Sequence, residues 1–224
     1  MGIDKALARM AVYFREPVNG LTHFIAMLLS FMGLGLLMWK TSHPFNPLTF
    51  TACTIFGLGL ILLYGASTLY HWLPVGEKGI GRLRRLDHTM IFVLIASSYT
   101  PFCLGPFRGT FGWSMLGTVW AIAVTGIVFK LFWIQAPRWI STLIYVFMGW
   151  IAVAGIGLMV RVMEPLAIFW LFSGGVFYSV GAVIYAFKKP NLFPGRLGFH
   201  EIFHIFVMLG SSSHFWAVYR YVAA

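Results

Sequence analysis

Charged residues are scarce in this sequence. Of its 224 residues, 10% are charged and 59% are hydrophobic. A soluble domain carries about 25% charged residues, so a soluble fold would leave much of this apolar surface facing water. The composition argues against a soluble protein and predicts one that is embedded in a lipid bilayer.

Acidic residues are scarcer than basic ones: the chain has 6 Asp and Glu against 16 Lys and Arg, a formal net charge of +10. Such a charge can indicate a nucleic-acid partner, but these cations fall between apolar segments, where anionic lipid headgroups explain them. We therefore predict no nucleic-acid partner. Most of the cations lie on one side of the predicted membrane, and the other side has only Lys40, Arg108, Arg161 and Arg220. This asymmetry predicts a cytoplasmic N-terminus and a C-terminus outside.

Cysteine is rare as well, with 2 residues and no CxxC pair. Cys53 and Cys103 are both expected near the outer ends of their helices, so a disulfide can form if those helices touch. We favour the alternative, in which both are small, buried apolar residues.

Long apolar runs are abundant. A transmembrane helix needs about 20 mainly apolar residues. Seven segments meet this requirement: Gly20–Met38, Leu48–His71, Asp87–Leu104, Thr110–Phe132, Trp139–Val160, Pro165–Phe187 and Phe199–Val222. We predict an all-α membrane protein, a seven-transmembrane helix bundle that residues 20–224 form as a single domain.

Residues 1–19 are predicted to be a cytoplasmic segment. Apolar residues recur there at helical spacing opposite basic ones: Ile3, Leu7, Met10 and Phe14 opposite Lys5 and Arg9. The pattern is typical of a short amphipathic helix on the membrane surface. A disordered polar tail is the alternative.

Ionisable side chains inside a membrane are costly and indicate a function. Several lie at one predicted depth, towards the cytoplasmic side: His23, His71, Asp87, His200 and His204. His200 and His204 are four residues apart, so they share one helix face about 6 Å apart along the axis. With His71 they make a set of three imidazoles that leaves one position open for water, as in catalytic zinc sites. We predict a Zn²⁺ site with ligands His71, His200 and His204.

Asp87 and Ser67 are the predicted catalytic residues. Asp87 can hydrogen-bond a ligand imidazole or the metal-bound water. Alternatively, Asp87 caps its helix and pairs with Arg84 or Arg85. Ser67 lies one turn before His71 and can hydrogen-bond the metal water or a developing oxyanion.

The stretch HEIFH, residues 200–204, matches the H-E-x-x-H pattern of metalloproteases. No further ligand follows at protease spacing, and the intramembrane aspartate, Asp87, precedes the motif. We therefore disfavour proteolysis. His88 is expected to face a neighbouring helix or the membrane interface, and His214 to pack closely or to line a cavity above the metal.

Motifs on four predicted helices resemble those of the hemolysin III family: EPVNGLTHFIA, the SxxxH of Ser67 and His71, the LDH around Asp87, and the HxxxH of His200 and His204. That family is the bacterial branch of the progestin and adipoQ receptor group, which includes the adiponectin receptors and is related to the alkaline ceramidases. The resemblance covers nearly the whole chain. It implies a seven-helix fold with the N-terminus inside, a zinc ion held by the three histidines, and contact between Asp87 and the zinc-bound water. The family pattern does not require a glutamate between the two histidines, which implies that Glu201 is incidental.

The favoured hypothesis is a multi-pass protein of the bacterial inner membrane that uses zinc to hydrolyse a lipid amide or ester. Its expected partners are membrane lipids, one of them a substrate with an acyl chain. Asp87 would orient water as general base. One alternative is a lipid-sensing receptor or membrane-homeostasis factor with a structural zinc, and a further one is a pore-forming cytolysin.

Overall fold

The computed structural model describes residues 12–193 and 197–223. In these residues it contains helices and no β-strand. The elements are α2 (Pro17–Thr41), α3 (Pro47–Trp72), α4 (Glu77–Leu104), α5 (Thr110–Phe132), α6 (Arg138–Trp150), the 3₁₀ helix η1 (Ile151–Gly155), α7 (Ile156–Val162), α8 (Pro165–Phe187) and α9 (Phe199–Tyr221). The predicted amphipathic helix falls largely on residues 1–11, outside the described residues.

Six stretches of the described chain are long and apolar enough to cross a membrane: α2, α3, α5, the combined stretch Arg138–Val162, α8 and α9. The all-helical fold is therefore confirmed. The helix α4 is not among these stretches, since its first half contains many charged residues, in the sequence EKGIGRLRRLDH. It begins ten residues before Asp87. The proposed role of Asp87 as a helix cap is therefore wrong.

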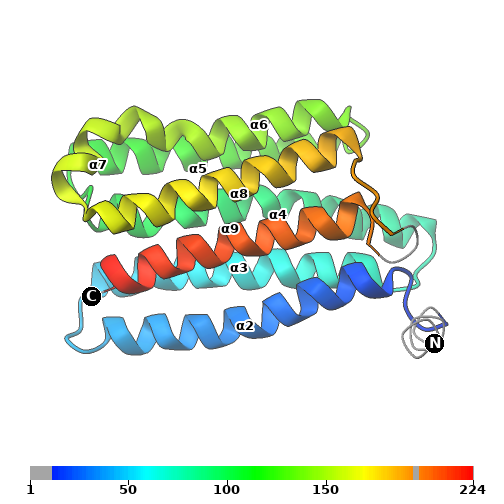
Figure 1. Cartoon of the computed structure of the whole chain (residues 1–224), viewed down its shortest axis with the longest axis horizontal. Coiled ribbons are helices and arrows are strands. Elements are labelled where there is room, and N and C mark those ends of the chain that lie inside the picture. Colours follow the sequence, from blue (N-terminus) through cyan, green and yellow to red (C-terminus); the bar gives the residue numbers. More distant parts are fainter. Residues whose placement is uncertain (1–11, 194–196, 224) are drawn as a thin grey trace.

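The helices lie side by side and alternate in direction (Figure 1). One end of the bundle, on the right in Figure 1, gathers the starts of α2, α4, α6 and α9 and the ends of α3, α5 and α8. Proline in the first turn marks the start of α2, α3 and α8. Proline suits that position because the first amide groups of a helix have no partner within it. This end of the bundle brings together polar residues that are far apart in the sequence.

The fifth apolar segment is interrupted by η1. The hydroxyl of Tyr99, from α4, donates to the carbonyls of Met148 and Gly149 at 2.9 and 2.7 Å, and it accepts from the Ala152 amide at 3.0 Å. A side chain that enters the backbone hydrogen-bond ladder in this way breaks the regular α-helix. The interruption therefore anchors the middle of this segment to α4.

Cys53 and Cys103 are free and buried, and they belong to different hydrophobic clusters. The prediction of two small buried residues is therefore confirmed.

Glycines allow close packing between α4 and α5. A Cβ atom on Gly126 would lie 2.2 Å from the ring of Phe92, which is fully buried. We expect Gly126→Ala to destabilise the folded protein by about 1–3 kcal/mol, because the ring has no room to move. The control is Gly117→Ala on the same helix, where a Cβ meets nothing within 4 Å. Thermal unfolding in detergent should show a lower Tm for the first variant alone, and equal Tm values would contradict the packing.

Candidate metal centre

Three imidazoles converge at the polar end of the bundle. One nitrogen of His71, at the end of α3, and one each of His200 and His204, in the first turns of α9, all lie within 4.8 Å of one another. The ring centroids of His71 lie 5.0 Å from those of both other histidines. His71 and His204 are each 1% exposed. The structure thus brings together the three residues that the sequence selects as ligands.

The Glu16 carboxylate orients His71. Its Oε2 lies 2.7 Å from Nδ1 of His71. Two neighbours hold the carboxylate: Asn19 donates to Oε2 at 3.1 Å, and Arg15 lies 3.4 Å from Oε1. When Nδ1–H donates to a carboxylate, Nε2 keeps its lone pair for a metal. Nε2 of His71 is buried and has no hydrogen-bond partner among the described residues, which fits a metal ligand.

The charge state of Glu16 agrees with this role. Burial alone raises the pKa of its carboxyl group, but the hydrogen bonds from His71 and Asn19 and the charge of Arg15 outweigh burial and hold the pKa below its ordinary value. Glu16 is therefore a carboxylate at neutral pH, and it accepts the imidazole proton.

Thr22 performs a similar task for His204. Its hydroxyl donates to the Asn19 carbonyl at 2.8 Å and lies 3.2 Å from Nδ1 of His204. Because the hydroxyl proton is already donated, the hydroxyl oxygen can accept from Nδ1–H, which leaves Nε2 as the ligand atom. Two of the three imidazoles are thus oriented by Glu16, immediately before α2, and by Thr22 within α2.

Sequence reasoning missed these two partners. It selects Asp87 as the residue that hydrogen-bonds a ligand imidazole, whereas in the structure Glu16 makes that bond. The signal was present, because Glu16, Asn19 and Thr22 place polar groups at helical spacing at the start of an apolar segment.

Replacing Glu16 tests its role directly. We expect Glu16→Gln to weaken metal affinity about 10- to 100-fold, the usual effect of losing the carboxylate partner of a ligand histidine. Glu164→Gln is the matched control, because Glu164 is exposed and also precedes a helix-starting proline. Competition titration with a chelating dye measures both affinities. Equal affinities would show that Glu16 does not orient a ligand.

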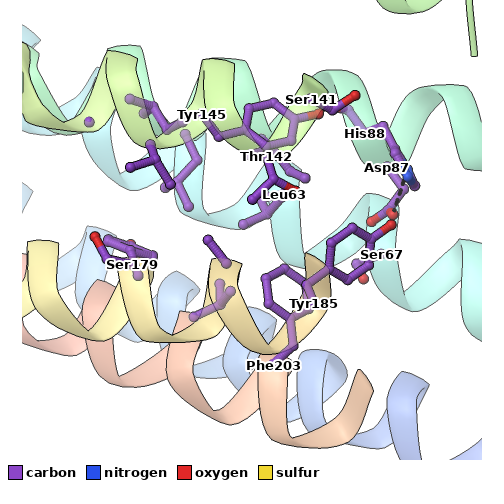
Figure 2. A pocket seen from close by; sticks show the side chains of 18 of the residues that line it. Leu63, Ser67, Asp87, His88, Ser141, Thr142, Tyr145, Ser179, Tyr185 and Phe203 are labelled. Atoms are coloured by element: carbon purple, nitrogen blue, oxygen red, sulfur yellow. Dashed lines mark hydrogen bonds and ion pairs between the residues drawn. The ribbon is translucent and has the colours of Figure 1, made fainter. Parts of the chain in front are cut away.

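A pocket of about 150 Å³ adjoins the centre, and its lining includes His200, His204, Asp87 and Ser67. Figure 2 shows Ser67 and Asp87 at one end of this pocket, beside Tyr185, and Ser179 at the other. Asp87 Oδ2 lies 3.3 Å from Nδ1 of His88. Both predicted catalytic side chains therefore face the cavity that the two α9 histidines line.

His88 lines this pocket too, between α4 and the neighbouring helices, and its carbonyl accepts from the Tyr145 hydroxyl of α6 at 3.1 Å. His23 is 3% exposed and its ring stacks on that of His204, with centroids 3.6 Å apart. Neither nitrogen of His23 has a hydrogen-bond partner in the described parts of the chain. His23 covers one face of the ligand ring, so it keeps solvent from that side.

The remaining polar residues of α9 lie away from the three-histidine cluster. Glu201 Oε2 accepts a hydrogen bond from the Gly198 amide at 2.8 Å, so Glu201 caps the helix. His214 Nε2 lies 3.1 Å from the Leu171 carbonyl, and the ring also lines the pocket. His214 therefore packs against a neighbouring helix and also lines the cavity, so the two predicted alternatives are compatible.

The sequence is similar over most of its length to known proteins of one family. The model of the family described as "Haemolysin-III related" matches residues 12–215. The "Hemolysin-3 homolog" of Bacillus subtilis (strain 168) is 38% identical over 206 residues, 92% of this chain and 93% of the relative. "Hemolysin-3" of Bacillus cereus is 36% identical over 224 residues, 98% of each chain. The human "Monocyte to macrophage differentiation factor" is 23% identical over 219 residues, 93% of this chain and 85% of the relative.

Proposed function

Because the chain belongs to the haemolysin-III related family, we propose that this integral membrane protein is a zinc-dependent hydrolase of a lipid amide or ester. The observation that supports the proposal is the placement of three inward-facing imidazoles beside a pocket that also contains a carboxylate. Intramembrane ionisable groups are kept where they serve a function.

His71, His200 and His204 would hold the zinc. Three neutral imidazoles suit zinc and leave one coordination position open, the pattern of catalytic rather than structural sites. When bound, zinc acts as a Lewis acid that polarises a carbonyl group and lowers the pKa of water. Glu16 and Thr22 keep Nδ1 of their histidines protonated, so that Nε2 stays available as ligand atom.

Asp87 would act as general base. Oδ2 of Asp87 lies 3.3 Å from Nδ1 of His88, and the other carboxylate oxygen would accept a proton from water. The Ser67 hydroxyl, which is buried and lines the same pocket, would donate to the oxyanion that develops on the carbonyl oxygen.

The pocket would hold the acyl chain of the substrate. Its walls include Leu63, Ile91, Leu94, Val146 and Val207, which exclude water and favour a hydrocarbon chain. A second cavity, of about 50 Å³, is lined partly by the same residues, Tyr99 and His214 among them. The lining of the second cavity includes none of the three clustered histidines, so the two cavities together extend the hollow space away from that cluster.

The proposed topology has seven transmembrane helices in a bacterial inner membrane. The seventh, in addition to the six apolar stretches, is α4, which packs between α3 and α5. Basic residues such as Arg15, Lys78 and Arg138 belong to the helix ends that meet at the histidine-bearing end of the bundle. The positive-inside rule then supports a cytoplasmic N-terminus and a metal centre near the cytoplasmic side.

The test is fatty-acid release by the purified, zinc-loaded protein from ceramides, N-acyl ethanolamines and lysophospholipids, followed by mass spectrometry. We expect release from at least one of these classes, loss of release after chelation, and recovery when zinc is restored. Zinc-loaded protein that releases no fatty acid from any of them would contradict the hydrolase.

One alternative has structural support. His71 and His204 are almost completely buried, which would also suit a structural zinc that joins α3 to α9 in a lipid-sensing receptor or homeostasis factor. A negative release assay with retained zinc would favour this role. Pore formation has less support, because a conducting path needs polar lining through the full depth of the membrane, and the histidine cluster and its partners lie at one end of the bundle.

A further inference from the structure

Lys130 is a buried cation that the proposed chemistry does not use. It lies in the last turn of α5, it is 2% exposed, and it lines the pocket. The ion pairs found among the described residues involve Arg15, His71 and His88, and none involves Lys130. An ammonium group buried without an opposite charge is costly. In the described part of the chain, no anion pairs with Lys130.

Arg84 of α4 adds a second positive charge to the lining of the same pocket. Asp87, a carboxylate of the pocket lining, is paired with His88 instead. A third cation, Arg138, stacks over the rings of Tyr185 and Phe199 at 5.2 and 6.0 Å. Two cations that line one pocket are stabilised by an anion that both contact.

Two hydroxyl groups on α6 are also without partners. Ser141 Oγ and Thr142 Oγ1 are buried, line the pocket and have no hydrogen-bond partner within residues 12–193 and 197–223. Most helix hydroxyls donate to a carbonyl one turn earlier, as Thr118 and Thr125 of α5 do at 2.8 and 2.9 Å. Figure 2 shows Ser141 and Thr142 near the pocket end that contains Asp87 and His88. Buried hydroxyls that do not donate to backbone are available to donate to a ligand.

We propose that Arg84, Lys130, Ser141 and Thr142 form an oxyanion-binding subsite for the phosphate or carboxylate headgroup of the lipid. Two cations and two hydroxyl donors, contributed by three helices, match the charge and the acceptor oxygens of such a group. The substrate of the proposed hydrolase is then an anionic amphiphile. This inference rests on the proposed function for its chemistry, but binding to the subsite requires no turnover.

A binding experiment tests the subsite with zinc-loaded protein in a neutral detergent. The ligands are an acyl-glycerol phosphate, the neutral monoacylglycerol with the same chain, and inorganic phosphate. We expect the acyl-glycerol phosphate to raise Tm of the wild type more than the neutral lipid does. Lys130→Met should weaken binding of the charged lipid by at least about tenfold and leave the neutral lipid unaffected, because a buried charge-assisted hydrogen bond is lost.

Two control variants complete the experiment. Lys130→Arg keeps the charge and should retain much of the preference for the charged lipid, and Lys78→Met removes an exposed cation and should change nothing. Stabilisation by inorganic phosphate that Lys130→Met abolishes also supports the oxyanion site and assigns it to the free ion. Equal stabilisation by charged and neutral lipids, or an unchanged preference in Lys130→Met, overturns the proposal. Zinc content and fatty-acid release are measured separately, so a failure of the hydrolase is distinguishable from a failure of this subsite.

Discussion

Replacing His204 with alanine is expected to abolish zinc retention. His204 is 1% exposed, and the centroid of its ring lies 5.0 Å from that of His71 and 4.7 Å from that of His200. Without it, two imidazoles remain, and two nitrogen ligands are fewer than the three protein ligands that hold zinc in catalytic sites. Metal analysis of the purified variant should find less than a tenth of the zinc of the wild type.

The control for this variant is His214→Ala. His214 is another histidine of α9, and it is partly buried, but its ring lies near the Leu171 carbonyl rather than in the three-histidine cluster. We expect this variant to keep its full zinc content. Zinc that persists in His204→Ala, or that disappears equally from both variants, would contradict the assignment of the ligands.

Replacing Asp87 with asparagine is expected to reduce hydrolysis about 10²- to 10⁴-fold, the typical contribution of a general base. Asparagine has nearly the same shape, so the pocket and the three histidines should be undisturbed. It cannot accept the proton, and its amide changes the pairing with His88. The variant should therefore bind zinc as the wild type does, and the loss should appear in kcat rather than in KM.

Glu201→Gln serves as the comparison for Asp87→Asn. Glu201 is the glutamate of the stretch HEIFH, but its carboxylate accepts from the Gly198 amide at the start of α9. A glutamine oxygen can accept the same hydrogen bond, so we expect near wild-type hydrolysis. If Glu201→Gln lost activity and Asp87→Asn kept it, the base would be Glu201 and the protein would resemble a metalloprotease in mechanism.

Much of the fold was predictable because a membrane helix is determined by its own residues: in lipid, each backbone polar group must be satisfied within the segment. The predicted segments Thr110–Phe132 and Pro165–Phe187 coincide with α5 and α8. The prediction fails at the start of α4, which begins at Glu77. Hydropathy cannot detect a charged helical extension, since the extension is not apolar. It also missed η1, which depends on a tyrosine from another helix.

The candidate site was predictable in part. The spacing of His200 and His204 follows from helix geometry alone, and alternating helix direction placed His71 at the same depth. Glu16 and Thr22 could not be assigned in this way, because their bonds join residues 55 and 182 positions apart in the chain. Such contacts depend on which faces of α2, α3 and α9 meet, and apolar periodicity is weak in helices that are surrounded by lipid and protein alike.

Zinc K-edge X-ray absorption of the purified, zinc-loaded protein tests the central claim most directly. The arrangement of His71, His200 and His204 predicts about one zinc per chain, with three imidazole nitrogen ligands at about 2.0–2.1 Å and one oxygen ligand. A spectrum without the multiple scattering of imidazole, or a zinc environment made of sulfur or of oxygen alone, would contradict it.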